Sequence, residues 1–119
     1  MNIIQAFSRI GQISGWRHSI AMQSAQLPLI QKLYARNDLE IKLTSYACPE
    51  QYEVFRNDRQ VAYYRLRHGE FRVDFPQCGG EIILCEYPNG DGIFDENERL
   101  IYLTKAIRKV LEKLNNPKQ

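Results

Sequence analysis

The chain is poor in cysteine and in long apolar runs, and each shortage excludes a class of protein. Its cysteines are Cys48, Cys78 and Cys85, an odd number without Cys-x-x-Cys spacing, which argues against a zinc ribbon and favours reduced thiols in a cytoplasm. No apolar run approaches the ~20 residues that a membrane span needs. The N-terminus lacks the long apolar core and the cleavage site of a secretory signal. We therefore expect a soluble cytoplasmic protein without membrane contact.

Acidic side chains are also missing from residues 1–37, which contain four basic residues. All 14 acidic residues, and most of the 16 basic ones, lie in residues 38–119. The net charge of +2 is too small to indicate a nucleic-acid partner by itself. With 119 residues, 44% of them hydrophobic, the chain can form one core. We expect a single domain in which residues 1–37 are a helical extension of an α+β core at residues 38–119.

Short segments of strand-like sequence follow one another closely in the middle of the chain. Residues 39–46 alternate between apolar and polar, as a half-buried strand does. The other predicted strands are residues 51–55, 60–67, 70–75 and 81–86. The last has apolar residues at both parities, so we expect it to be buried on both faces, with Cys85 as a small core residue. Short connections favour an antiparallel meander of about five strands.

Helical stripes lie on both sides of this run. Residues 18–36 look helical, although Pro28 should end or kink the helix near Leu27. A second helix is expected from Glu96 to Leu114, with Asp95 as its cap and Glu98 completing an acidic capping box. Its apolar stripe consists of Leu100, Leu103, Ile107, Val110, Leu111 and Leu114. Segregated strands and helices indicate an α+β fold with helices packed on one sheet face.

The N-terminal residues 1–16 leave two interpretations open. Ile3, Phe7 and Ile10 have helical spacing, but two glycines weaken any helix there. The segment is either a short docking helix or extension, or a segment that binds a membrane surface or a partner.

The most informative stretch is residues 63–75, which read as a β-hairpin with His68-Gly69 as a two-residue turn. That turn places Arg65 opposite Arg72, Leu66 opposite Phe71 and Arg67 opposite Glu70. One side of the hairpin is then apolar, and the other is charged. The charged side consists of Tyr63, Arg65, Arg67, Glu70, Arg72 and Asp74. Opposed arginines normally destabilise a sheet, so either a nearby carboxylate or an external anion must balance them. Replacing both by serine is expected to leave the fold intact.

The candidate binding residues are the aromatic, basic and imidazole side chains of this hairpin: Tyr63, Arg65, Arg67, His68 and Arg72. Arginine forks bind carboxylates and phosphates, so we expect an acidic protein partner, as for an inhibitor- or immunity-type protein. The alternative on the same face is nucleic-acid binding, with a base stacked on Tyr63, or phosphodiester cleavage with His68 as acid or base. A plain solvated face, balanced by local acids, is the third interpretation. No catalytic residue and no cofactor is assigned.

A calcium loop is a further alternative at Asn89, Asp91, Asp95 and Glu98. These residues match positions three, five, nine and twelve of an EF-hand-type loop. Position one is Tyr87, which supplies no carboxylate. A glycine-containing turn followed by a capped helix explains the same residues without a metal.

Three sequence strings carry a resemblance. They are CPEQYEVF at residues 48–55, YYRLRHGEFRV at 63–73 and NGDGIFDENER at 89–99. Together they resemble small bacterial proteins of uncharacterised function, over about residues 45–112. The resemblance implies no activity and no site residue. It suggests that residues 1–37 are an appendage to the core.

Overall fold

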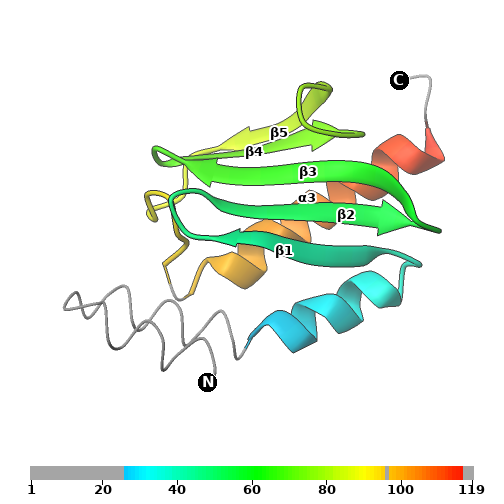
Figure 1. Ribbon diagram of the computed structural model, residues 1–119, viewed down its shortest axis with the longest axis horizontal. Helices are drawn as coiled ribbons and strands as arrows, with labels where there is room; N and C mark the ends of the chain where they lie inside the picture. Colours follow the sequence, from blue (N-terminus) through cyan, green and yellow to red (C-terminus); the bar gives the residue numbers. More distant parts are fainter. Residues whose placement is uncertain (1–25, 96, 117–119) are drawn as a thin grey trace.

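Five antiparallel strands form one sheet in which sequence neighbours are also neighbours in space (Figure 1). The computed structural model describes residues 26–95 and 97–116. The strands are β1 (Glu40–Tyr46), β2 (Glu50–Arg56), β3 (Arg59–Arg67), β4 (Glu70–Phe75) and β5 (Glu81–Glu86). A helix at residues 26–35 precedes them and α3 (Arg99–Asn115) follows them. The predicted α+β meander is therefore confirmed.

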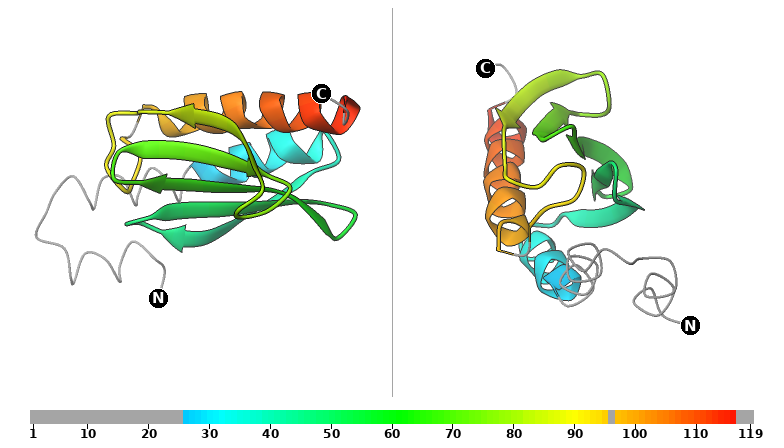
Figure 2. Two further views of the ribbon diagram at one scale, coloured as in Figure 1. Left: turned by 90° about the horizontal axis from the view of Figure 1, so that it is seen from above. Right: turned by 90° about the vertical axis from the view of Figure 1, so that its left-hand side faces the viewer.

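Both helices pack against the same face of the sheet, and no described helix covers the other face (Figure 2). Side chains from every strand and from both helices form one buried cluster between these layers. The helix at residues 26–35 contributes Ile30 and Tyr34, while α3 contributes Leu103, Ile107 and Val110. Residues 1–25, and with them the predicted stripe of Ile3, Phe7 and Ile10, lie outside the described residues. The division of the chain at residue 37 stays a prediction.

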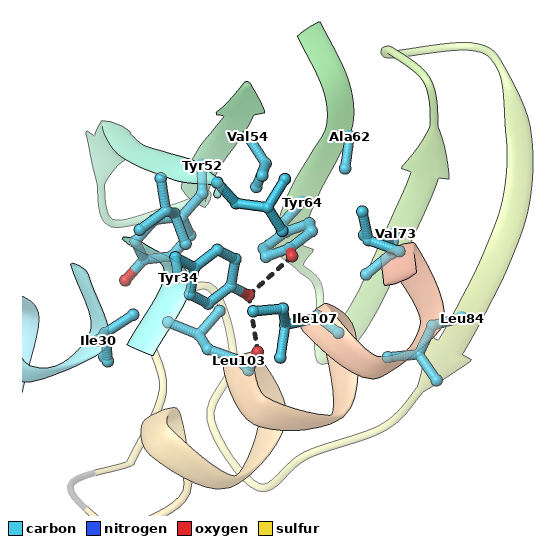
Figure 3. Close-up of a cluster of buried hydrophobic side chains, with 14 of the residues drawn as sticks. Ile30, Tyr34, Tyr52, Val54, Ala62, Tyr64, Val73, Leu84, Leu103 and Ile107 are labelled. Atoms are coloured by element: carbon cyan, nitrogen blue, oxygen red, sulfur yellow. Dashed lines mark hydrogen bonds between the residues drawn. The ribbon is translucent and has the colours of Figure 1, made fainter. Parts of the chain in front are cut away.

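A tyrosine pair joins three elements inside this cluster (Figure 3). The Tyr34 hydroxyl lies 2.7 Å from the Tyr64 hydroxyl of β3 and donates to the backbone carbonyl of Leu103 in α3 at 2.7 Å. Both side chains are fully buried, and burial raises the pKa of each phenol. Buried hydroxyls are costly unless they are hydrogen-bonded, so this pair fixes how the helix at residues 26–35, the sheet and α3 meet.

Replacing Tyr34 by phenylalanine is expected to lower the free energy of unfolding by about 1–2 kcal/mol, because it leaves the Tyr64 hydroxyl and the Leu103 carbonyl short of a partner. Urea unfolding followed by circular dichroism measures the change. The matched control is Tyr87→Phe, whose side chain is 72% exposed and which should cost less than about 0.5 kcal/mol. Equal costs for the two variants would contradict this role.

The β3–β4 hairpin has the predicted turn and register. His68 and Gly69 have φ angles of 54° and 75°, as a two-residue turn of this type requires. Arg65 pairs with Arg72, and Leu66 pairs with Phe71. Leu66 and Phe71 are fully buried on the helix-covered face, so the sorting of apolar and charged side chains is also confirmed.

The burial predicted for β5 is wrong. Only Leu84 of this strand is buried, Ile82 is 55% exposed, and Cys85 is exposed. The reason is topological, because β5 is the terminal strand and α3 covers one of its faces only. Sequence alternation does not distinguish a strand at the sheet edge from one at its centre.

Two details of the helices also differ from expectation. The α3 helix begins at Arg99, and Leu100 in its first turn is 43% exposed rather than part of the buried stripe. Residues 26–35 are helical throughout, Pro28 included, so the helix does not end at Leu27, whereas the alternative of a kink there stays a prediction. Ile30 and Tyr34 follow Pro28 and are fully buried, and this packing holds the stretch as a helix.

Candidate functional site

The candidate binding residues lie on the sheet face that the helices leave uncovered. Along β3 the side chains alternate, so Tyr63, Arg65 and Arg67 point away from the helices while Tyr64 and Leu66 enter the core. The register then brings Arg72 of β4 beside Arg65. The predicted tyrosine and the three predicted arginines therefore lie on this face, but they differ in their contacts with the rest of the protein.

Arg72 is balanced from within the protein. Its Nε lies 3.0 Å from Oδ1 of Asp74, two residues further along the same strand, and its Nη2 donates to Oδ2 at 3.4 Å. Asp74 is only 1% exposed and also accepts a hydrogen bond from the Gly79 amide. The local carboxylate of Asp74 thus offsets the repulsion between Arg65 and Arg72. The prediction that both arginines can become serine without harm is therefore revised, since losing Arg72 leaves a buried carboxylate without its cation.

Tyr63 is also engaged. Its hydroxyl donates to Oε1 of Gln51 on β2 at 2.7 Å, and its ring is half-buried. Burial and the nearby Cys78 thiol raise the pKa of this phenol. The side chain contributes a fixed aromatic surface to the face, with its polar end already satisfied.

Arg65 and Arg67 are the arginines of this face that remain available. Within the described residues no carboxylate lies within ion-pair distance of either one, although Glu70 sits directly opposite Arg67. Both line a surface hollow of about 300 Å³ together with His68, Glu70 and Tyr87. We call this feature the arginine hollow. It offers two guanidinium forks, one imidazole and an exposed phenol to a bound molecule.

The hollow contains no arrangement that points to catalysis. His68 is exposed at the turn, and no cysteine or second histidine contributes to the lining. Among residues 26–95 and 97–116, no group of three histidine, cysteine or acidic side chains is placed to hold a metal ion. Of the predicted binding residues, Arg65, Arg67 and His68 line this hollow, whereas Tyr63 and Arg72 do not.

The residues of the calcium hypothesis serve the loop itself. Both oxygens of the Glu98 carboxylate accept backbone hydrogen bonds, from Asn89 at 2.9 Å, Gly90 at 2.7 Å and Asp95 at 3.0 Å. The bond from Asp95 is one half of the predicted capping box, although no side chain caps α3 at Glu98. A calcium ligand needs its oxygens free, so Glu98 is placed to close the loop rather than to bind the ion.

Sequence reasoning missed the most deeply buried charges, Glu50 at the start of β2 and Arg99 at the start of α3. Both side chains are completely buried, and the guanidinium meets the carboxylate through two bonds of 2.8 and 3.0 Å. Glu50 also accepts bonds from the Tyr52 hydroxyl and the Phe94 amide. Burial alone would lower the pKa of Arg99, but the bonds to Glu50 raise it above its ordinary value.

A signal for this pair is present in the sequence. Glu50 has the same strand parity as Tyr52 and Val54, which are fully buried, so alternation places its carboxylate on the core face. Arg99 lies four residues before Leu103, on the buried stripe of α3. A charge on each of two core-facing positions indicates a buried ion pair.

The strings at residues 48–55 and 89–99 meet at this pair. The Gly92 carbonyl accepts bonds from the amides of Cys48 and Glu50, both at 2.8 Å. Gly92 has a φ of 91°, and a Cβ there would lie 3.1 Å from the Cys48 sulfur. These two strings are therefore explained by the way the two loops lock together, without any ligand.

Comparison with models of protein families finds no match, and neither the curated proteins nor the solved structures contain a similar chain. No helix in the described part of the chain is long and apolar enough to span a bilayer.

Proposed function

We propose that the protein is a small accessory protein of the inhibitor or immunity type, which binds an acidic protein partner through the uncovered face of its sheet. The observation that carries the proposal is the arginine hollow, where Arg65 and Arg67 project from one strand and no carboxylate of the described residues lies within ion-pair distance of either one. Arginine is strongly suited to carboxylate recognition because its planar fork binds two oxygens at once. Tyr63 and Tyr87 add rigid aromatic area at either side of the arginines, and such residues are common anchors at interfaces.

The mixed charge of the face favours a protein over a nucleic acid. Glu53 and Glu70 lie on the same uncovered face as the arginines, where they would repel a phosphate backbone. A folded protein surface can instead match cations and anions position by position. A cytoplasmic location belongs to this proposal, and its support is that Cys48, Cys78 and Cys85 are all free thiols.

The test compares partner capture by the full chain and by two double variants of equal charge. Arg65→Ser/Arg67→Ser removes the free guanidinium groups of the hollow. Arg59→Ser/Arg108→Ser removes two exposed arginines elsewhere, at the β2–β3 turn and on α3. Each immobilised chain is incubated with lysate of the source organism, and bound proteins are quantified by mass spectrometry. We expect acidic proteins retained by wild type to fall at least tenfold for the hollow variant only, since hot-spot arginines contribute about 2 kcal/mol or more.

Two further arms test whether the imidazole contributes to binding and whether the partner is a protein or a nucleic acid. His68→Asn keeps a residue that tolerates positive φ at the turn, so any loss of binding reports on the imidazole rather than on the hairpin. A single-stranded oligonucleotide is titrated at several salt concentrations, because phosphate binding gives a steep linear fall of log affinity with log salt. Tight, salt-steep oligonucleotide binding that disappears in Arg65→Ser/Arg67→Ser would replace the acidic protein by a nucleic acid.

A further inference from the structure

The outer edge of β5 lies apart from the arginine hollow and shares no lining residue with it. β5 ends the sheet, and in the described part of the chain no strand pairs with its outer side (Figure 1). Every second residue of such an edge directs its backbone N–H and C=O outward. These unpaired groups can receive an added strand, and Ile82 beside them is 55% exposed.

Lysines of α3 line this edge. Lys113 pairs with Glu81 at one end of β5 at 2.8 Å, and Lys105 pairs with Glu86 at the other end at 2.9 Å. Lys109 lies between them at helical spacing. Its Nζ is 3.7 Å from a carboxylate oxygen of Glu112, and both of these side chains are exposed to solvent. The two strand glutamates are thus neutralised by lysines, whereas Lys109 is held only weakly.

A hollow of about 260 Å³ between β5 and α3 brings these features together. Its lining consists of Glu81, Ile82, Ile83, Lys109, Glu112 and Lys113. The hollow therefore joins the apolar side chains of the strand to two ammonium groups of the helix, of which Lys113 is paired closely with Glu81 and Lys109 only weakly with Glu112. A bound segment with an apolar side chain beside an acidic one matches both walls.

We propose that the outer edge of β5 receives an extended segment of a partner protein as a sixth strand, in which acidic and β-branched residues alternate. Backbone bonds to β5 supply the pairing, an apolar side chain covers Ile82, and a carboxylate pairs with Lys109. A second copy of this chain fits less well. Two β5 strands joined edge to edge would bring the lysines of one α3 toward the same lysines of the other. The proposal does not depend on the function assigned to the arginine hollow.

The experiment titrates the full chain with capped six-residue peptides and follows backbone amide shifts by NMR. The first peptide alternates glutamate and valine, and the second alternates lysine and valine. Two more acidic peptides carry N-methyl groups, one on every glutamate and the other on every valine. Strand addition uses the amides of one edge only, so we expect the acidic peptide and one of its methylated forms to shift residues 81–86. The other methylated form and the lysine peptide should not bind.

Charge variants test the role of Lys109. Lys109→Glu should lower the affinity for the acidic peptide about fivefold. Lys32→Glu makes the same change of charge at an exposed position of the helix at residues 26–35 and should not lower that affinity. Equal binding of both methylated peptides would mean that the peptides bind by charge alone, without backbone hydrogen bonds to β5, and would overturn the proposal. Shifts confined to residues near Arg65 and Arg67 would overturn it too and move the acidic segment to the arginine hollow. Self-association of the free chain through β5, seen by sedimentation, would replace the partner by a second copy.

Discussion

Replacing Arg99 by methionine is expected to lower the free energy of unfolding by about 3–5 kcal/mol, the loss typical of breaking a buried ion pair from one side. The substitution removes the two bonds of 2.8 and 3.0 Å to Glu50 and leaves that carboxylate in the core without a cation. Glu50 is completely buried, so water cannot replace the lost partner. A small domain has roughly 5–15 kcal/mol of stability in total, so this one change removes a large part of it.

Denaturant unfolding of wild type and three variants measures this effect. Arg108→Met is the matched control, because Arg108 is exposed on the same helix and should change stability by less than about 0.5 kcal/mol. The double variant Glu50→Gln/Arg99→Met should be more stable than Arg99→Met alone, because it removes the buried negative charge. A loss below 1 kcal/mol for Arg99→Met would mean that the buried pair contributes little to the junction between β2 and α3.

Replacing Glu98 by alanine is expected to cost about 3 kcal/mol, because three backbone N–H groups lose their acceptor together. One of them, on Gly90, is buried, and this glycine is closely surrounded by backbone atoms of Ile93, Phe94 and Asp95. The loop therefore has little room in which to find other partners or to admit water. Local loosening of the loop should accompany the loss of global stability.

Thermal unfolding with and without calcium tests the Glu98 prediction against the metal hypothesis. The control Asp91→Ala changes an exposed acid of the same loop and should alter stability by less than about 0.5 kcal/mol. A loop closed by Glu98 gives the same unfolding temperature in millimolar calcium and in chelator. If calcium stabilised wild type but neither Asp91→Ala nor Glu98→Ala, the loop would be a calcium-binding site and the Glu98 prediction would be wrong.

The hairpin could be predicted in detail because two independent signals agree there. The turn at His68-Gly69 fixes which residues face each other, and the alternation from Tyr63 to Phe75 fixes which side is buried. A slip by one residue would place Arg65 and Arg72 in the core, so the sequence allows one register only. The same agreement gave the bounds of β4 correctly.

What could not be predicted depends on residues far apart in the chain. The exposure of Ile82 follows from the strand order, which no local pattern of β5 contains. The pairing of Glu50 with Arg99 joins positions 49 residues apart, so the periodicity that places each of them toward the core does not say which residue is its partner. The ion pair between Arg72 and Asp74, only two residues apart, could not be predicted for a different reason. Alternation placed both side chains on one face, but only the structure shows that Asp74 is buried there.

The internal and external charges of this chain are therefore used differently. Glu50, Asp74 and Glu98 are buried acids whose oxygens are occupied by the protein's own donors. Arg65 and Arg67 have no such acid beside them in the part of the chain that the structure describes. We propose that these two arginines are the cations that bind a partner.

The most direct test of this distinction is to measure unfolding free energy and partner retention on the same samples of wild type, Arg65→Ser/Arg67→Ser and Arg59→Ser/Arg108→Ser. We predict that the hollow variant unfolds within about 0.5 kcal/mol of wild type but no longer retains the acidic protein, whereas the control behaves as wild type in both measurements. Retention of the same partner by the hollow variant, at unchanged stability, would contradict the assignment of this sheet face as a binding surface.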